Sequence, residues 1–350
     1  MKNYKNINQA DIKEIVNNLG IEINKLNNKK ILLLGSEGFL GKYFVQVFNE
    51  ILNTSNNNFY IDCFDNFISS VPQRKKKFNK NIIFRRKNIT NYKFKKKYDY
   101  IIYLAGIASP VIYKKYPMET LEVSYDGVKN LLAKVKKDKS KFIFFSSSEI
   151  YGNPDFKNLP TKENYYGYVN SFGPRSCYDE GKRIGETLCY IFKEYFNCSL
   201  SIVRPFNVFG PMMDKNDFRI LPNIVDKIKN KKKILIHGSG RQTRTFCYIT
   251  DAMTGFFKVI LSNISGKIWN IGNPNNEINM LNLVKVINNI SKRKNKYKLI
   301  KYPKNYPADE PKRRCPDISQ AKKYLNFNPK IDIKLGIARM LKYNDLILKK

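Results

Sequence analysis

The sequence predicts an α/β fold in which a doubly wound parallel sheet is joined to a smaller C-terminal lobe. Three observations support this prediction. Short apolar runs recur along the first part of the chain without the alternation of a half-exposed strand, as in parallel strands that are buried on both faces. Segments with apolar residues at helical spacing separate these runs. A glycine-rich turn links the first run to the first long helix, and the 350 residues suffice for a full core.

The expected elements follow one another in strand-helix-strand order. A first helix is expected around residues 9–19, and the apolar run KILLLG over residues 30–35 then predicts a buried strand. Residues 39–52 carry apolar side chains at helical spacing, and the strand after them ends at Asp65. Further strands are expected over residues 82–88, 98–106, 141–148 and 200–207, with helices centred near residues 117–136 and 178–195.

The pattern becomes less regular from residue 206, which favours a second lobe built partly from excursions out of the main sheet. Signals are mixed over residues 211–236, 272–280 and the proline-rich passage 303–316. We therefore expect three parts. They are a helical extension over residues 1–29, a sheet domain over residues 30–205 to which residues 238–271 return, and a smaller lobe over residues 206–237 and 272–350.

The formal net charge of +35 raises the alternative of a protein that binds nucleic acid or an anionic surface. Lysines are spread over nearly the whole chain together with many Asn, Ile and Tyr residues, which is the bias that AT-rich coding produces. The sequence contains no module that combines basic residues with stacking aromatics. We therefore expect no nucleic-acid partner, and we expect the positive field to steer a small anionic ligand instead.

Other bulk features exclude several classes of protein. The chain has no run of about 18 apolar residues, so no membrane span is expected. The polar N-terminus lacks the apolar core of a secretion signal, which favours the cytoplasm. Six scattered cysteines without a C-x-x-C pair, and a single imidazole at His237, argue against disulfides and against a metal site. We expect His237 to pack without a catalytic role.

Three glycines carry the first functional motif. Gly35, Gly38 and Gly41 follow the first strand and open the first long helix, with Phe39 and Leu40 between them. Such glycines allow backbone N–H groups and the helix N-terminus to approach a pyrophosphate. The sheet domain is therefore expected to be a Rossmann-type domain that binds a dinucleotide.

An acidic residue at the end of the second strand predicts the identity of this cofactor. Asp65 is placed to accept hydrogen bonds from the ribose hydroxyls of NAD and to repel the 2′-phosphate of NADP, with Asp62 as the fallback. The basic run over residues 74–77 could tolerate that phosphate. NAD is the expected cofactor, and NADP is the alternative.

A Tyr-x-x-x-Lys pair carries the second motif. Tyr178 and Lys182 lie one helical turn apart, so both side chains share one face of the helix. The Lys182 ammonium and a nearby nicotinamide cation would both favour the phenolate of Tyr178, which would then act as a general base for a hydroxyl group. The serine-rich strand end over residues 146–148, followed by Glu149, brings hydroxyls and a carboxylate to the edge where doubly wound sheets bind ligands.

With these motifs in order, residues 30–335 resemble the extended short-chain dehydrogenase/reductase family of nucleotide-sugar epimerases, dehydratases and decarboxylases. The segment GPRSCYDEGKR over residues 173–183, with GETLC after it, is most similar to the UDP-glucuronate decarboxylases, also called UDP-xylose synthases. Asp65-Asn66, Ala108-Ser-Pro110, Arg204-Pro-Phe-Asn207, Gln242-Thr-Arg244 and Arg313-Arg314 add further matches.

The resemblance implies an NAD-dependent oxidation of the sugar at C4, then loss of carbon dioxide from C6 and protonation at C5. Its catalytic residues would be Ser147, Glu149, Tyr178, Lys182 and Arg314. The residues for NAD would be Gly35, Gly38, Phe39, Leu40, Gly41, Asp65, Asn66, Asn88, Leu104, Ala105, Gly106, Ser146, Tyr178 and Lys182. The residues for a UDP-sugar would be Tyr113, Ser147, Asn207, Arg219, Gln242, Arg244 and Arg314, the last one near the glucuronate carboxylate.

The resemblance also implies a homodimer through the helices near residues 117–136 and 178–195, and a place in polysaccharide biosynthesis. Some positions depart from the decarboxylases. Glu122 stands where they carry a lysine near the substrate, Ser124 replaces an asparagine, and Asn88 replaces the aspartate that meets adenine. A 4-epimerase or a 4,6-dehydratase therefore remains an alternative, although Ser148 stands where dehydratases carry the aspartate of an Asp-Glu pair.

Overall fold

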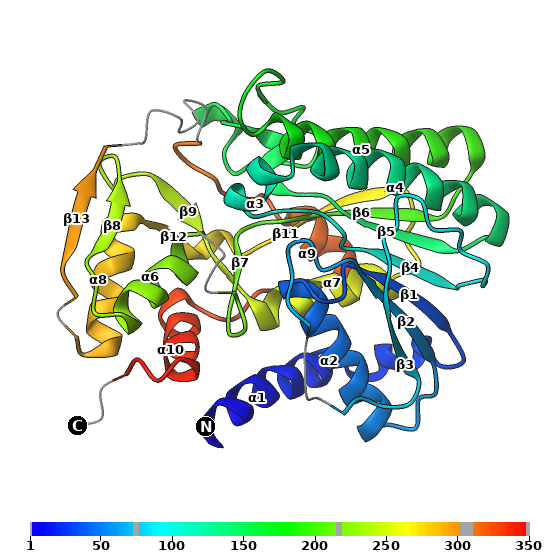
Figure 1. Ribbon diagram of the computed structural model, residues 1–350, viewed down its shortest axis with the longest axis horizontal. Coiled ribbons are helices and arrows are strands. Elements are labelled where there is room, and N and C mark those ends of the chain that lie inside the picture. Colours follow the sequence, from blue (N-terminus) through cyan, green and yellow to red (C-terminus); the bar gives the residue numbers. More distant parts are fainter. Residues whose placement is uncertain (1, 73–76, 215–218, 294, 302–310, 348–350) are drawn as a thin grey trace.

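A seven-stranded parallel sheet forms the centre of the protein (Figure 1). The computed structural model describes residues 2–72, 77–214, 219–293, 295–301 and 311–347. The strands of this sheet are β1 (Lys30–Leu34), β2 (Tyr60–Asp65), β3 (Ile82–Arg86), β4 (Tyr100–Tyr103), β5 (Lys141–Phe145), β6 (Leu200–Pro205) and β11 (Lys267–Ile271). Their order is β11-β6-β5-β4-β1-β2-β3, so the order of the strands reverses at β1.

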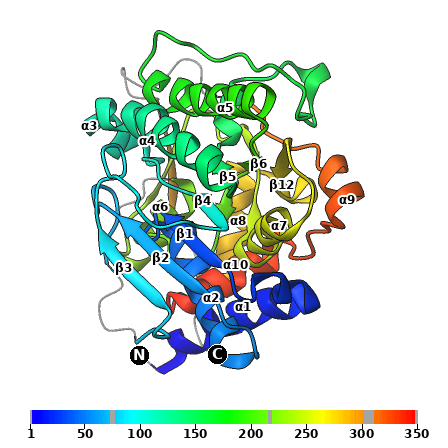
Figure 2. The same cartoon turned by 90° about the vertical axis from the view of Figure 1, so that its right-hand side faces the viewer.

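Helices cover both faces of the sheet (Figure 2). One face carries α4 (Pro117–Asp138) and α5 (Ser176–Phe196), with the short α3 (Pro110–Lys115) beside them. The other face carries α1 (Lys2–Leu19), α2 (Phe39–Thr54) and α7 (Ile249–Leu261). This arrangement, with every strand parallel and helices on both faces, confirms the predicted doubly wound fold.

The alternation of side chains along the strands divides the core into two layers. On β1, Ile31 and Leu33 join the cluster that includes α2 and α7, whereas Leu32 and Leu34 join the cluster beneath α4 and α5. Successive side chains of a strand point to opposite faces, so a strand that is apolar at every position must be buried on both. Phe44 of α2 fills the first layer, because its ring contacts those of Phe145 and Phe257.

The smaller lobe lies beside the sheet, at the left of Figure 1. Its strand pairs are β7 (Val208–Phe209) with β10 (Cys247–Tyr248), β8 (Ile234–His237) with β13 (Tyr297–Ile300), and β9 (Thr243–Thr245) with β12 (Glu277–Asn279). Its helices are α6 (Ile220–Lys229), α8 (Met280–Ser291) and α10 (Ile333–Tyr343), and α9 (Ser319–Leu325) lies near β11. Short 3₁₀ turns are η1 (Gly20–Leu26), η2 (Ser148–Tyr151), η3 (Phe156–Asn158) and η4 (Pro274–Asn276).

The expected strands and helices of the sheet domain are present within a few residues of their predicted ends. The helix expected around residues 9–19 begins earlier, at Lys2. Part of the proline-rich passage 303–316 and most of the basic run 74–77 fall outside the described residues. No helix in the described part of the chain combines the length and the apolar character that crossing a membrane requires.

The N-terminal helix is fixed to both parts of the molecule. Asp11 of α1 accepts a hydrogen bond of 2.8 Å from the hydroxyl of Tyr248, which precedes α7, and lies 3.3 Å from the guanidinium of Arg339 on α10. Burial raises the pKa of the Asp11 carboxyl to about 7, although both partners favour its charged form. The extension therefore packs as an integral layer of the fold.

Helix α5 lies very close to the sheet. At Gly185 of α5, a Cβ would meet the ring of Phe144 at 2.4 Å. Glycine in a helix interior costs about 1 kcal/mol relative to alanine, so close packing is its compensation here. The same helix carries Lys182 about one turn earlier and Tyr178 about two turns earlier.

We predict that Gly185→Ala lowers the free energy of unfolding by about 1–3 kcal/mol, because the added methyl overpacks the contact with Phe144. Urea denaturation monitored by circular dichroism measures the change. Thr187→Ala, at an exposed position of the same helix, is the matched control and should leave stability nearly unchanged. A stability gain in Gly185→Ala, as helix propensity alone would give, would contradict the packing argument.

Candidate active site

The carboxyl ends of β1, β4 and β5 meet where the strand order reverses, which is where doubly wound sheets bind ligands. Gly35 follows β1 with a φ of +81°, and a Cβ on it would lie 2.8 Å from the backbone nitrogen of Ala105. A Cβ on Gly41 would lie 2.1 Å from the carbonyl oxygen of Gly35. Both positions require glycine, whereas a Cβ on Gly38 would make only an ordinary 3.5 Å contact with the same oxygen.

The N-terminus of α2 opens onto this edge. Gly38 is its N-cap and brings no side chain to cap the first turn, and Phe39 and Leu40 are the first helical residues. Across the gap, Leu104, Ala105 and Gly106 follow β4. This arrangement fits a pyrophosphate, because nothing larger than a hydrogen atom projects from the glycines at the closest backbone approach.

Asp65, rather than Asp62, is the carboxylate at this edge. Its two oxygens accept hydrogen bonds from the backbone N–H groups of Glu37 at 2.9 Å and Phe67 at 2.8 Å, which fix its orientation. Asp62 instead accepts hydrogen bonds from Tyr98 at 2.8 Å and Lys96 at 2.9 Å. Asp62, the fallback candidate, therefore ties β2 to the segment that contains Lys96 and Tyr98.

Two asparagines extend the same edge. Asn66 follows β2 and its side chain accepts a hydrogen bond from the backbone N–H of Ile68 at 3.1 Å. Asn88 follows β3 and accepts hydrogen bonds from the backbone and the hydroxyl of Thr90. Both asparagines are exposed, so their remaining polar atoms can face a ligand.

Tyr178 and Ser147 meet beyond the end of β5. Their hydroxyls are hydrogen-bonded, and the ring of Tyr178 stacks on that of Tyr113 with centroids 5.6 Å apart and planes 9° apart. Burial raises the pKa of the Tyr178 phenol to about 12, although the bond to Ser147 and the charge of Arg219 lower it. The stacking and the burial fix where the phenolic oxygen lies.

Lys182 lies behind Tyr178 on the same face of α5. Its ammonium donates a 2.9 Å hydrogen bond to the carbonyl of Phe145 and lies 5.9 Å from the centre of the Tyr178 ring. Burial lowers the pKa of Lys182 to about 8, against the opposing charge of Glu186. Burial of the phenol outweighs the nearby charges here, and the lower pKa expected of Tyr178 with Lys182 and a nicotinamide cation beside it stays a prediction.

A buried cluster of ion pairs surrounds Glu149 at the start of η2. Both of its carboxylate oxygens accept hydrogen bonds from the terminal nitrogens of Arg314, one of them at 2.9 Å, and Arg175 donates to the second oxygen as well. Burial by itself would raise the pKa of Glu149, but Arg314 and Arg175 outweigh it and hold that pKa well below its usual range. Glu149 is therefore a firmly held carboxylate.

Further cations from the smaller lobe face the same region. Arg244 is the middle residue of β9, and its positive charge lowers the pKa of Glu149. Arg219 is the N-cap residue of α6, and its positive charge lowers the pKa of Tyr178. Gln242 donates from its side chain to the carbonyl of His237 at 3.0 Å. A region with several guanidinium groups fits an anionic ligand with phosphate or carboxylate groups.

Several buried polar atoms at this edge find no hydrogen-bond partner among the described residues. They are the hydroxyl oxygens of Ser146 and Tyr113, the side-chain nitrogen of Asn207 and the Nε of Arg314. Buried polar groups normally have partners, so a group of orphans at one place indicates a bound ligand. Together with the glycine turn and Asp65, they fit NAD and a polar substrate.

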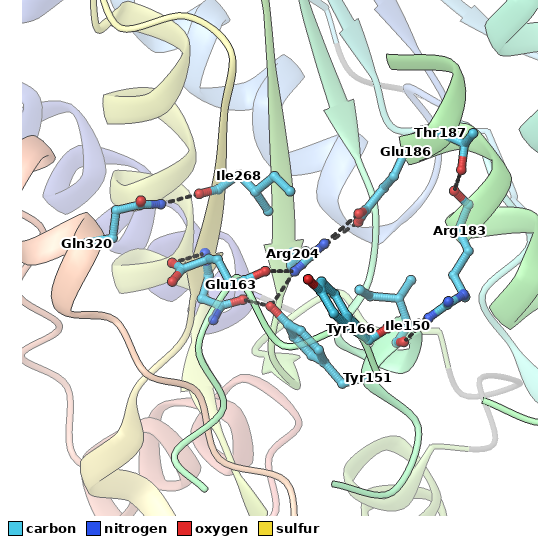
Figure 3. A network of polar contacts seen from close by, with 11 residues as sticks. Ile150, Tyr151, Glu163, Tyr166, Arg183, Glu186, Thr187, Arg204, Ile268 and Gln320 are labelled. Carbon is cyan, nitrogen blue, oxygen red and sulfur yellow. Dashed lines mark hydrogen bonds and ion pairs between the residues drawn. The ribbon is translucent and has the colours of Figure 1, made fainter. Parts of the chain in front are cut away.

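A second polar network fixes α5 to the strands (Figure 3). Arg204 of β6 makes two hydrogen bonds to the carboxylate of Glu186, at 2.9 and 2.6 Å, and donates at 2.6 Å to the hydroxyl of Tyr151. Tyr151 in turn donates to the side chain of Asn270 on β11 at 2.7 Å. The network therefore ties the helix of Tyr178 to η2 and to two strands.

Two of the positions that depart from the decarboxylase pattern, Glu122 and Ser124, lie on α4. Glu122 is exposed on α4 and lines a surface hollow of about 500 Å³ with Asp126 and Lys129. Ser124 is buried against Gly181 of α5, where a Cβ would lie 3.3 Å from its hydroxyl. Ser124 therefore affects the packing of α4 against α5, and Glu122 affects the exposed surface of α4.

Sequence analysis missed Arg175 and the pair Arg204–Glu186 as functional residues. Arg175 stands in the motif over residues 173–183, three residues before Tyr178 and four before Asp179, so helical spacing could have paired it with Asp179. Its contact with Glu149 joins residues 26 positions apart, which spacing does not reveal. Among the described residues, no group of three His, Cys, Asp or Glu side chains could hold a metal ion.

Comparison with known proteins follows this geometry. The sequence model of the NAD dependent epimerase/dehydratase family matches residues 31–272. UDP-glucuronic acid decarboxylase 6 of Arabidopsis thaliana is 33% identical over 316 residues, which cover 90% of this chain and 88% of that protein. UDP-glucuronic acid decarboxylase 1 of Xenopus tropicalis is 30% identical over 325 residues, covering 92% of this chain and 73% of its own length.

A solved structure of similar fold is UDP-glucuronic acid 4-epimerase from Bacillus cereus in complex with UDP-glucuronic acid and NAD. It is 26% identical to this chain, with a TM-score of 0.76, and the match covers 90% of this chain and 99% of that one. The likeness therefore extends over both the sheet and the smaller lobe.

We predict that Gly41→Ala weakens NAD binding at least about tenfold, because the methyl collides with the Gly35 carbonyl and displaces the turn at the helix N-terminus. Isothermal titration calorimetry with NAD measures the change. Thr54→Ala, at an exposed position near the end of the same helix and away from the glycine turn, is the control and should bind NAD as the wild type does. Equal affinities for the two variants would contradict the steric argument.

Proposed function

The chain belongs to the NAD dependent epimerase/dehydratase family, and on this premise we propose that it decarboxylates UDP-glucuronate to UDP-xylose or its 4-keto intermediate. It is an NAD-dependent enzyme that modifies a nucleotide-sugar. The observation that carries the finer proposal is the buried pair of Glu149 and Arg314 beside the hydroxyls of Tyr178 and Ser147. The relatives named UDP-glucuronic acid decarboxylases support it over most of the chain.

The hydroxyls of Tyr178 and Ser147 act on the C4 hydroxyl of the sugar during its oxidation. Tyr178 accepts the proton of the C4 hydroxyl, and Ser147 hydrogen bonds to the same oxygen and orients it. Lys182 holds the cofactor ribose, and its hydrogen bond to the carbonyl of Phe145 fixes its place. When bound, NAD supplies the acceptor for the hydrogen and electron pair that leave C4, and a positive charge that favours the phenolate.

Decarboxylation follows from the ketone at C4. The C6 carboxylate is then that of a β-keto acid, so the C5–C6 bond can break and carbon dioxide can leave. The bonding pair passes into the enolate of C4 and C5, and C5 then takes up a proton. Arg314 binds the carboxylate before the bond breaks, and Glu149 controls the protonation of C5.

The remaining residues are proposed to bind the two ligands. Gly35, Gly38, Phe39, Leu40, Gly41, Asp65, Asn66, Asn88, Leu104, Ala105, Gly106 and Ser146 would contact NAD. Tyr113, Asn207, Arg219, Gln242 and Arg244 would contact the nucleotide-sugar. Of the segment 238–271 that is expected from the sequence to return to the sheet domain, residues 238–248 carry β9 and β10 of the smaller lobe. We propose that residues 30–205 with 249–271 mainly serve the cofactor, and that residues 206–248 and 272–350 mainly serve the sugar nucleotide.

We further propose that the protein is a homodimer of the cytoplasm that supplies sugars for polysaccharide biosynthesis and does not bind nucleic acid. The outer surfaces of α4 and α5 support the dimer, because Met118, Tyr190 and Tyr195 are large and exposed there. The six cysteines support a reducing compartment, since all of them are free thiols.

Incubation with UDP-glucuronate labelled at C6 tests the proposed reaction. We expect the NAD-loaded enzyme to release labelled carbon dioxide and to form UDP-xylose or its 4-keto form, measured by trapping the gas and by mass spectrometry of the nucleotide-sugars. UDP-glucuronate that returns unchanged, or only with C4 inverted, would sink the decarboxylase proposal. The second result would identify a 4-epimerase, and loss of water would identify a dehydratase.

Replacing Tyr178 with Phe tests the proposed base. The change removes the phenolic oxygen but keeps the ring that stacks on Tyr113, so the fold and the affinity for NAD should persist. We expect turnover to fall by about 100-fold or more, the usual contribution of a general base. The decisive comparison is kcat against the Kd for NAD, and retained turnover in Tyr178→Phe would refute the role of Tyr178.

A further inference from the structure

Arg175 is the N-cap residue of α5, and its guanidinium lies between two carboxylates. One terminal nitrogen donates to Oε2 of Glu149, and the Nε donates to Oδ2 of Asp179 at 3.2 Å. Its side chain is largely buried, at 12% exposure. A buried guanidinium with two bound carboxylates is held in one orientation, because its planar fork cannot rotate without losing one of them.

Charges of alternating sign follow one another through this cluster. Arg314 contacts Glu149, Glu149 contacts Arg175, and Arg175 contacts Asp179. The four groups come from the segment before α9, from η2 and from the first turn of α5. Their charges sum to zero, which reduces the cost of burying them together.

Arg314 holds Glu149 with both of its terminal nitrogens, at Oε1 and at Oε2. In the proposed function the same guanidinium binds the C6 carboxylate of the sugar. A guanidinium has five N–H donors, and the Nε of Arg314 is buried without a partner among the described residues, so this edge of the guanidinium is free for a second carboxylate. A carboxylated sugar that binds there shares the positive charge of Arg314 with Glu149 and weakens the hold of Arg314 on Glu149.

A carboxylate whose bidentate cation is shared with a second anion is held less firmly, so a second holder is needed when the sugar is bound. Arg175 is that holder, because it contacts Glu149 from α5, and Asp179 fixes it from behind. Asp179 lies one helical turn after Arg175, and its Oδ1 is buried without a partner among the described residues. Asp179 therefore has no described competitor for its contact with Arg175.

We propose that Arg175 is a positioning residue that keeps the Glu149 carboxylate in place while Arg314 also binds the C6 carboxylate of the sugar. The inference rests on the proposed decarboxylation and names its substrate class. A sugar with a neutral group at C6 leaves Arg314 to Glu149 alone. Only a carboxylated sugar therefore makes the contact between Arg175 and Glu149 decisive for the protonation of C5.

The test uses the NAD-loaded enzyme with C6-labelled UDP-glucuronate and follows two quantities. One is the 4-keto sugar in quenched single turnovers, which reports oxidation at C4. The other is carbon dioxide release, together with the pH dependence of its rate. For Arg175→Met we expect carbon dioxide release to fall by about tenfold or more, while oxidation falls by less than about threefold.

The pH profile separates a positioning role from a merely structural one. Arg314, Arg175 and Arg244 are the cations that act on Glu149, and Asp179 is the nearby acid. Loss of one cation should move the acidic limb of the profile upward by about one pH unit. Arg175→Lys keeps the charge and should restore most of the position of that limb.

Arg183 provides the matched control on the same helix. Its guanidinium donates to the backbone carbonyl of Ile150 at 3.2 Å, next to Glu149, and to that of Tyr166 at 2.7 Å (Figure 3). It thus supports the backbone of η2 without touching the Glu149 carboxylate. Arg183→Met should leave the ratio of carbon dioxide release to oxidation at the wild-type value.

A double variant tests whether Arg175 acts through Glu149. In an enzyme that already carries Glu149→Gln, Arg175→Met should lower carbon dioxide release by less than about twofold further. A full tenfold further loss there overturns the inference. So does a wild-type pH profile in Arg175→Met, or an equal loss of oxidation and carbon dioxide release in Arg175→Met and Arg183→Met.

Failure of the inference differs from failure of the proposed function. A wild-type enzyme that releases no carbon dioxide from UDP-glucuronate overturns both. A wild-type enzyme that does release it, with an Arg175→Met variant that matches it, overturns the inference alone.

Discussion

The position of α5 against the end of β5 is the constraint on which the rest of the site depends. Gly185 allows the helix to approach the ring of Phe144, and the ammonium of Lys182 reaches the carbonyl of Phe145 at 2.9 Å. The bidentate pair of Glu186 and Arg204 fixes the same helix to β6. These contacts place Tyr178 relative to the strand ends, because three contacts within about one turn hold the helix against sliding and rotation.

Burial and the nearby charges together determine the pKa values of the ionisable groups in this site. The interior raises the pKa of Tyr178 and lowers that of Lys182, so both groups resist their charged forms in the folded protein. Around Glu149 the balance is opposite, since two guanidinium groups outweigh burial. The site therefore favours neutral forms of Tyr178 and Lys182 and the charged form of Glu149, as sites with separate acid and base groups do.

The sequence could predict a cofactor-binding edge because the requirements of such an edge are local. Gly35 and Gly41 are needed wherever a strand turns into a helix at this distance, and Asp65 follows its strand directly. The choice between Asp65 and Asp62 still needed the structure, which gives Asp62 to Lys96 and Tyr98. Glu122 is expected near the substrate from the resemblance alone, and the structure shows only that it is exposed on α4.

By itself the sequence determined the order of strands and helices, the dinucleotide turn and the Tyr178–Lys182 pair, since each depends on residues within a few positions of one another. The tertiary structure alone decided which charges meet. Arg314 and Arg175 reach Glu149 over separations of 165 and 26 residues, and no periodicity records such pairs. It also decided the pKa of Tyr178, because burial depends on the whole fold, whereas helical spacing gives only the nearest charge.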